Sequence, residues 1–81
     1  MSYRVVPHAS ARTQLAGFPS DALDALLSRL ADVADQPWDA LPVHGSPSEF
    51  RQAQFGEHGL VSFHVNDTTE VITVYDVTWA G

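Results

Sequence analysis

The spacing of apolar residues changes halfway along the chain, and this change limits the folds open to it more than any other feature. From Leu23 to Ala34 the apolar residues recur every three or four positions, which is the repeat of a helix that buries one face. After Glu49 they alternate with polar residues, as they do in strands. The sequence therefore predicts helices in its first half and a sheet in its second half.

Two groups of turn-forming residues divide the second half into three predicted strands. The strands are expected at residues 50–55, 60–65 and 70–79, with turns at residues 56–59 and 66–69. Consecutive strands joined by short turns predict an antiparallel meander. Strict alternation along the last strand places five residues on one face: Val71, Thr73, Tyr75, Val77 and Trp79.

The first half begins with a short predicted strand at residues 3–6, which Pro7 ends because proline lacks a backbone donor. A weak helical pattern over residues 8–16 closes at Gly17. A second helix is expected to start at Ser20, whose hydroxyl can cap it, with Pro19 just outside. Its core face is predicted to hold six residues: Leu23, Leu26, Leu27, Leu30, Val33 and Ala34.

Residues 36–47 contain three prolines and predict an irregular crossing segment that buries Trp38 or Leu41 as an anchor. The order strand, helix, helix, three strands indicates an α+β domain over residues 1–81, in which two N-terminal helices pack on one face of a small antiparallel sheet. The N-terminal strand is expected to be its fourth member. The other face is partly apolar and is a candidate partner surface.

Charge and composition exclude several classes of function. The chain has four arginines, no lysine and ten acidic residues, for a formal net charge of −6, which argues against a general nucleic-acid-binding surface. With no cysteine there is no disulfide, thiolate metal site or cysteine nucleophile. The spacing of the histidines fits no metal motif and no glycine-rich phosphate loop is present, so no cofactor or metal is expected. Without a signal peptide or an apolar run long enough to span a bilayer, a cytoplasmic protein is expected.

Three short segments resemble the RelE/ParE toxin family, including its YoeB branch. Leu41 and Gly45 followed by Phe50-Arg51 are similar to the family's Leu-x-Gly segment and aromatic-Arg step. Residues 55–63 are similar to its Gly-Asp-Tyr-Arg-Val-Ile-Tyr hairpin, and residues 74–77 to its last strand. The likeness extends over nearly the whole chain in the order of its elements, and it implies the family's β-α-α-β-β-β fold.

The resemblance implies a toxin of a toxin–antitoxin pair, bound by a cognate antitoxin whose apolar peptide covers the sheet or the helices. It implies either a ribosome-dependent mRNA endoribonuclease or, as in the ParE branch, an inhibitor of DNA gyrase. The chain departs from the ribonuclease pattern at two positions, because Gly59 and Ala53 stand where the family has arginine. It also ends at residues 77–81 without the family's Arg, His or Tyr after the last strand.

RNA cleavage through the 2′-hydroxyl needs a base, an acid and a cation beside the phosphate. Histidine titrates in the neutral range, which makes candidates of His8, His44, His58 and His64. Only His58, His64 and Arg51 are expected in the sheet region, so these three are the candidate catalytic residues, with Arg51 on the phosphate. Glu49 or Glu57 could serve as a base if burial raised its pKa.

Each of the three candidates also has a structural interpretation. His64 on a strand face can be a half-buried packing residue, and His58 in a glycine-flanked turn can be simply solvated. Arg51 can form an ion pair with a helix carboxylate such as Asp32 or Asp35. The alternative function is therefore a non-catalytic binding module that keeps the scaffold and acts through protein contacts or as a homodimer.

Overall fold

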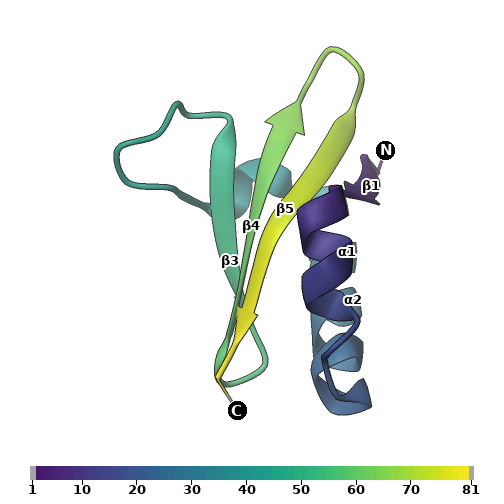
Figure 1. The fold of residues 1–81 in the computed structure, drawn as a ribbon. Helices are drawn as coiled ribbons and strands as arrows, with labels where there is room; N and C mark the ends of the chain where they lie inside the picture. The colour runs from purple at the N-terminus through teal and green to yellow at the C-terminus, as the bar shows by residue number, and fades with distance from the viewer. Residues whose placement is uncertain (1, 81) are drawn as a thin grey trace.

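A computed structural model describes residues 2–80 and shows two helices packed against one face of a five-stranded sheet (Figure 1). The helices are α1 (Ala9–Leu15) and α2 (Ser20–Asp35), followed by a single 3₁₀ turn, η1 (Pro37–Asp39). The strands lie in the order β1-β5-β4-β3-β2. Their bounds are Arg4–Pro7 for β1, Leu41–Pro42 for β2, Phe50–Phe55 for β3, Gly59–Asn66 for β4 and Val71–Trp79 for β5. The predicted α+β class is confirmed.

The sheet is mixed, whereas the sequence predicted an antiparallel one. The meander β3-β4-β5 is antiparallel as expected, but β1 pairs with β5 in parallel, with Val5 opposite Ile72. The two helices carry the chain from β1 to the far edge of the sheet, and three alternating strands then return it with β5 pointing the same way as β1. Alternation of apolar residues carries no information on the relative direction of distant strands.

The segment predicted as irregular, residues 36–47, contains η1 and also β2, a strand that the sequence did not predict. Leu41 and Pro42 pair with Gln52 and Arg51 of β3, and proline is tolerated there because β2 is an edge strand. The predicted anchor is wrong, since Trp38 is 39% exposed and Leu41 is 65% exposed. The small residues Pro37 and Ala40 are buried instead, because the short turn presents them to the core.

The predicted ends of the first elements shift by a residue or so. Pro7 is the last residue of β1 rather than its stop, and the His8 N–H makes the next ladder bond, to the Val74 carbonyl at 2.7 Å. His8 is the N-cap of α1, where its Nδ1 accepts a hydrogen bond from the Ser10 N–H at 3.3 Å. Ser20 is the first residue of α2 and Pro19 its N-cap, without a side-chain cap bond.

A β-bulge at Tyr75 overturns the strict alternation predicted for β5. Ser62 pairs with Asp76 while the next residue of β4, Phe63, pairs with Val74, so Tyr75 is an extra residue. Beyond this extra residue, the side chains of β5 point to the opposite faces from those that strict alternation predicts. Val77 is therefore buried on the helix side together with Val74, rather than sharing the open face with Val71.

Helix α1 covers the edge of β5 beyond the end of β1 (Figure 1). The Gln14 side chain takes the place of a strand partner: its Oε1 accepts from the Val77 N–H at 2.8 Å and its Nε2 donates to Asp76 at 2.8 Å. The Ser10 hydroxyl donates to the Tyr75 carbonyl at 2.9 Å. These side chains satisfy the bulged edge of β5 and leave it closed to a further strand.

Candidate functional site

Arg51 has a structural role in β3. Alternation places it on the helix-covered face with Ala53, and its Nη1 donates to the Ala40 carbonyl at 3.0 Å. Its Nε donates to the Ser48 carbonyl at 2.8 Å, and its guanidinium carbon lies 4.8 Å from the centre of the Trp38 ring. The side chain therefore ties the crossing segment to the edge of the sheet.

The ion pair predicted between Arg51 and a helix carboxylate does not form. Asp32 pairs with Arg29 of its own helix at 3.8 Å, and Asp35 accepts a hydrogen bond from the Ser2 hydroxyl at 2.5 Å. Backbone carbonyls of the crossing segment lie closer to Arg51 than either carboxylate, because β2 and η1 pass directly beside β3.

Replacing Arg51 with alanine is expected to lower the free energy of unfolding by about 1–2 kcal/mol, because two hydrogen bonds from a charged donor and the contact with Trp38 are lost. Urea unfolding of the variant, with Arg51→Lys as the matched control, measures this loss. The lysine variant should recover only part of it, since an ammonium cannot reproduce the guanidinium fork. Unchanged stability of the alanine variant would contradict the structural role.

His64 lies on the other face of the sheet, which the helices leave uncovered. It stands directly opposite Phe50 on β3, with ring centres 4.9 Å apart, and Phe50 in turn meets Tyr75 edge-on with centres 5.6 Å apart. We call Phe50, His64 and Tyr75 the open-face cluster; all three side chains are half-buried. The other cross-strand neighbour of His64 is Thr73, so the histidine has an aromatic ring and a hydroxyl beside it across the strands.

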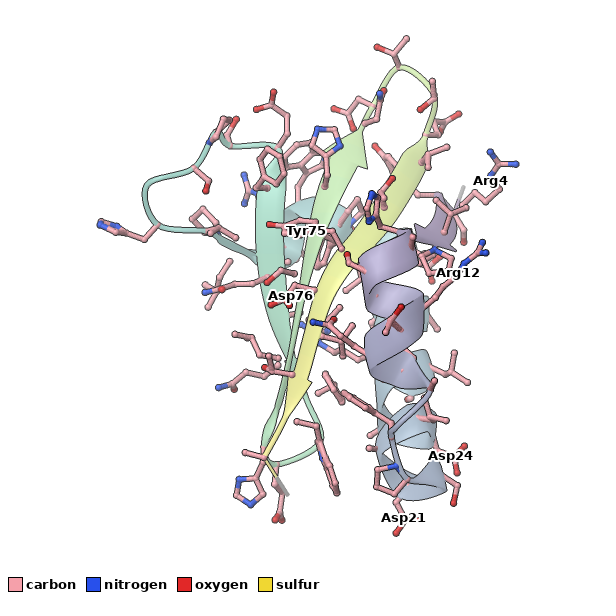
Figure 2. All side chains as sticks on the ribbon, viewed as in Figure 1. Arg4, Arg12, Asp21, Asp24, Tyr75 and Asp76 are labelled. Atoms are coloured by element: carbon pink, nitrogen blue, oxygen red, sulfur yellow. The ribbon has the colours of Figure 1, made fainter. Side chains whose placement is uncertain are left out.

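Tyr75 lies in an environment that disfavours its ionised form. Burial, and secondly the negative charge of Asp76, raise the pKa of the Tyr75 hydroxyl above its ordinary value. Figure 2 shows Tyr75 and the neighbouring Asp76 reaching over the sheet from β5. Tyr75 was not among the predicted site residues, although alternation places it on the same face as Thr73.

The folded chain should lose stability above about pH 10, the pKa of tyrosine in an unfolded chain. Between that pH and the raised pKa of Tyr75, the unfolded state releases the phenolic proton and the folded state keeps it, so rising pH favours unfolding. Urea unfolding from about pH 8 to about pH 11, a range that spans the tyrosine pKa, measures this slope. The Tyr75→Phe variant should show a smaller slope. The pKa of Tyr3 is also raised, chiefly by its hydrogen bond to Asp67, so some slope remains in the variant. Identical slopes in the two proteins would contradict the assigned environment.

His58 lies in the turn between β3 and β4, at the opposite end of β4 from His64. It is exposed, its Nε2 is 3.9 Å from Glu57, and its carbonyl accepts a hydrogen bond from the Ala80 N–H at 3.1 Å. Six residues of extended strand correspond to about 20 Å. The three predicted catalytic residues therefore occupy three separate places: Arg51 on the helix side, His64 on the open face and His58 at the turn.

The two positions that depart from the family pattern lie in the core. Ala53 is buried, and Gly59 is buried opposite Phe55, whose own side chain is 2% exposed. A Cβ atom on Gly59 would lie 2.5 Å from Cε2 and Cζ of the Phe55 ring. A side chain at position 59 therefore has no room.

An apolar groove of about 420 Å³ runs between β1, α1 and α2. The wide apolar face predicted for α2 splits into two stripes, because one face of a helix cannot turn all six residues toward the sheet. Leu26 and Val33 are buried beneath the sheet, whereas Leu27 is 64% exposed. We call this surface the α2 groove; its lining is Val5, Pro7, Leu15, Leu23, Leu26, Leu27, Leu30, Ala31, Ala34 and Val74.

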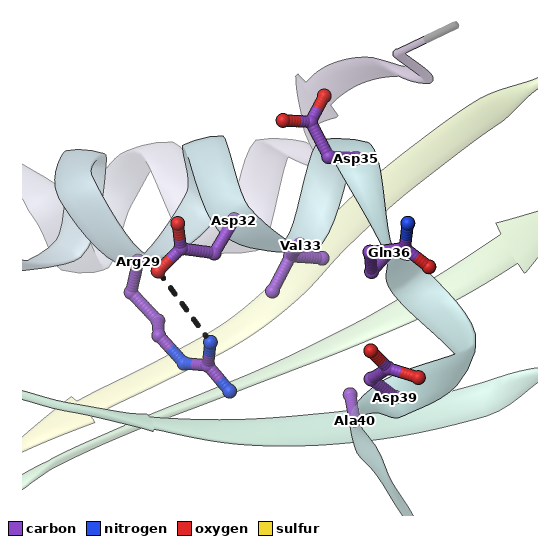
Figure 3. A pocket seen from close by; sticks show the side chains of 7 residues that line it. All are labelled: Arg29, Asp32, Val33, Asp35, Gln36, Asp39 and Ala40. Carbon is purple, nitrogen blue, oxygen red and sulfur yellow. Dashed lines mark ion pairs between the residues drawn. The ribbon is translucent and has the colours of Figure 1, made fainter.

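A second pocket, of about 390 Å³, lies between the end of α2 and η1 and is polar (Figure 3). Arg29 and Asp32 form an ion pair on one side of it, and Asp35 and Asp39 stand on the other. Over residues 2–80, no three histidine, cysteine or acidic side chains are placed to hold a metal ion. Within the same residues, no helix is long and apolar enough to cross a membrane.

Comparison with known proteins gives matches in structure only. No protein-family model matches the sequence, and neither does any curated protein sequence. The toxin–antitoxin complex RelBE2 from Mycobacterium tuberculosis contains a chain that matches with a TM-score of 0.87 at 18% identity, over 99% of this chain and 100% of that one. A chain of the intact RelBE complex of E. coli matches with a TM-score of 0.86 at 20% identity, over 99% of both chains.

An arginine-to-alanine double mutant of the E. coli toxin RelE in the free state matches with a TM-score of 0.85 at 21% identity, over 99% of this chain and 85% of that one. These likenesses run through every element of the sheet and both helices. They confirm the predicted resemblance at the level of the fold: the chain has the fold of the RelE toxins.

Proposed function

We propose that this chain is the toxin-like member of a toxin–antitoxin pair, that it works in the cytoplasm, and that a cognate antitoxin protein binds it. The observation that carries the proposal is the match of nearly the whole chain to chains of two RelBE toxin–antitoxin complexes. The net charge of −6 and the absence of lysine favour a protein as the main partner over RNA or a ribosome.

We further propose that the chain acts by binding rather than by cutting RNA. A ribonuclease needs a cation where charge develops on the phosphate, close to its acid and base. Arg51 is engaged by two backbone carbonyls on the face opposite His64, and His58 is about 20 Å of strand away from His64. Ala53 and Gly59 lie inside the core. A cationic side chain at either position would therefore require the core to repack.

Inducing the chain alone in bacterial cells tests the proposed function. Growth should stop, and co-expression of the short reading frame next to its gene should restore growth. The matched control is Phe63→Asp, which places an unpaired carboxylate at a position that is fully buried and so should abolish folding and arrest together. Normal growth on induction of the unaltered, folded chain would overturn the proposal.

The second candidate is mRNA cleavage on the ribosome, favoured by the open-face cluster. Aromatic rings on an uncovered sheet face can stack on bases, and His64 stands among them. In that reaction His64 would take the proton of a 2′-hydroxyl, whose oxygen would attack the adjacent phosphorus. The 5′-oxygen would leave with a proton from an acid, and a 2′,3′-cyclic phosphate would remain. His58 is too distant to be that acid in the same step.

The supercoiling of a reporter plasmid distinguishes gyrase inhibition from binding to another protein and from mRNA cleavage. Growth arrest accompanied by relaxed plasmid would identify gyrase as the bound target. Arrest with normal supercoiling and intact mRNA would instead direct the search to another protein.

A further inference from the structure

The bulge in β5 places two consecutive side chains, Tyr75 and Asp76, on the same face of the sheet. Tyr75 lies on the open face, where its ring meets that of Phe50. In a regular strand the residue after it would point to the helix side. The bulge instead pairs Asp76 with Ser62, which alternation along β4 places on the same face as His64. We call Tyr75 and Asp76 the bulge pair: an aromatic ring and a carboxylate side by side on the uncovered face.

Asp76 has no cation beside it in the part of the chain that the structure describes. Its side chain is half-buried, and the one hydrogen bond it makes within residues 2–80 comes from the Gln14 amide at 2.8 Å, which is a neutral donor. Neither of the two ion pairs among the same residues includes it. Its charge acts on the neighbouring ring, since it contributes to the raised pKa of the Tyr75 hydroxyl. A half-buried carboxylate in this state favours a positively charged partner.

The arginines of the chain all lie away from the bulge pair. Arg51 is on the helix side of β3, where two backbone carbonyls accept its hydrogen bonds. Arg29 extends from α2 to the edge of β3, where it donates to a backbone carbonyl at 3.1 Å. Figure 2 shows Arg4 and Arg12 on the other side of α1 from the bulge pair. Because the chain also contains no lysine, a nucleic acid on this surface would place its phosphates beside an unbalanced carboxylate.

The guanidinium of an arginine matches the chemistry of the bulge pair. A guanidinium can lie against an aromatic ring while two of its N–H groups donate to a carboxylate, because its fork is planar and rigid. The ring of Phe50, whose centre is 5.6 Å from that of Tyr75, adds a second aromatic surface. A lysine ammonium fits less well, since it meets a carboxylate as a point charge and is more strongly hydrated.

We infer that the bulge pair is a binding site for an arginine side chain of a partner protein, with the Tyr75 ring against the guanidinium and the Asp76 carboxylate accepting its hydrogen bonds. This inference rests on the proposal that the chain acts by binding a protein, and it adds the surface and the chemistry of the partner. The net charge of −6 supports it, because an acidic chain attracts a basic segment.

An NMR titration of the full chain with a peptide of alternating glycine and arginine tests the site. The amide signals of Ser62, Tyr75 and Asp76 should shift, whereas those in the middle of α2 should not. Asp76→Asn should raise the Kd for the peptide about tenfold, since charge-assisted hydrogen bonds are lost. The asparagine can still accept the bond from Gln14, and circular dichroism shows whether the fold is intact.

The matched control is Asp24→Asn, which removes the same charge from an exposed position on α2. It should raise the Kd about twofold or less, because a distant exposed charge is screened by salt. A peptide with citrulline in place of arginine, which has nearly the same shape without the charge, should not bind. Equal losses in the Asp76 and Asp24 variants would overturn the inference, since the peptide would then respond only to total charge.

Substitution of Tyr75 separates the ring from its hydroxyl. Tyr75→Leu should raise the Kd about threefold, because the contact of the cation with the ring is lost, whereas Tyr75→Phe should bind the peptide as the unaltered chain does. Equal binding by the leucine and phenylalanine variants would show that the ring takes no part and would contradict the assigned site.

Single-stranded oligouridylate is the competing probe and should leave the signals of the open face unchanged. If this RNA shifts the same signals and binds more tightly to Asp76→Asn than to the unaltered chain, the face belongs to nucleic acid and the inference fails. Selective loss of peptide binding in Asp76→Asn, in a chain whose induction leaves growth normal, would support the arginine site and reject the toxin proposal. Growth arrest with equal losses in the two aspartate variants would reject the arginine site and keep the toxin proposal.

Discussion

Leu26→Ala is expected to lower the free energy of unfolding by about 2–5 kcal/mol, as buried leucines do when their removal leaves a cavity. Leu26 is 2% exposed and sits between α2 and the sheet, in a core whose members from β3 to β5 include Phe55, Phe63 and Val74. For a domain of this size that is a large part of the total stability. Urea unfolding followed by circular dichroism measures it.

The neighbouring residue supplies the control for Leu26→Ala. Leu27 has the same side chain on the same helix but is 64% exposed, so Leu27→Ala should change the stability by about 0.5 kcal/mol or less. Equal losses in the two variants would contradict the placement of Leu26 in the core and of Leu27 on the exposed side of α2.

Gly59→Arg is expected to destabilise the fold by roughly 3 kcal/mol or more, because it forces a side chain into the Phe55 ring and leaves a charge unpaired at a buried position. It should also fail to create ribonuclease activity, although the family resemblance places an arginine there. Thermal unfolding and an mRNA cleavage assay on the same preparation give the two results.

Gly17→Arg is the matched control, since a Cβ atom on Gly17 meets only the Gln14 carbonyl, at 3.9 Å, and the residue is exposed. Gly17→Arg should lower the free energy of unfolding only slightly. Phe55→Ala combined with Gly59→Arg should cost less than the sum of the two single changes, because the first makes room for the second. A stable, RNA-cleaving Gly59→Arg protein would show that this end of the sheet is open.

The helices and the meander could be predicted because their signals are local. The three- and four-residue spacing around Leu26 places α2, and the turn residues around Gly56 place the β3–β4 hairpin. The parallel partnership of β1 and β5 and the bulge at Tyr75 could not be predicted. Both depend on how distant strands meet, and a bulge reverses the faces of β5 without changing its composition.

The candidate site was harder to predict than the fold, for a physical reason. The sequence places Arg51 and His64 on strands that are adjacent in the sheet, but their side chains fall on opposite faces because β3 pairs Phe50, not Arg51, with His64. A shift of one residue in register would have put them together. The exposure of Leu27 was missed for a similar reason, since spacing on a helix shows which residues share a side but not how wide the buried side is.

Mapping the 5′ ends of cellular mRNA after induction of the chain, beside its His64→Ala variant, tests most directly the claim that it acts by binding. His64 is the candidate that lies on the open face among aromatic rings, so the variant removes the best-placed acid or base while leaving the core intact. The account predicts growth arrest with intact mRNA in both strains. New mRNA ends that appear with the unaltered chain and vanish with His64→Ala would contradict it.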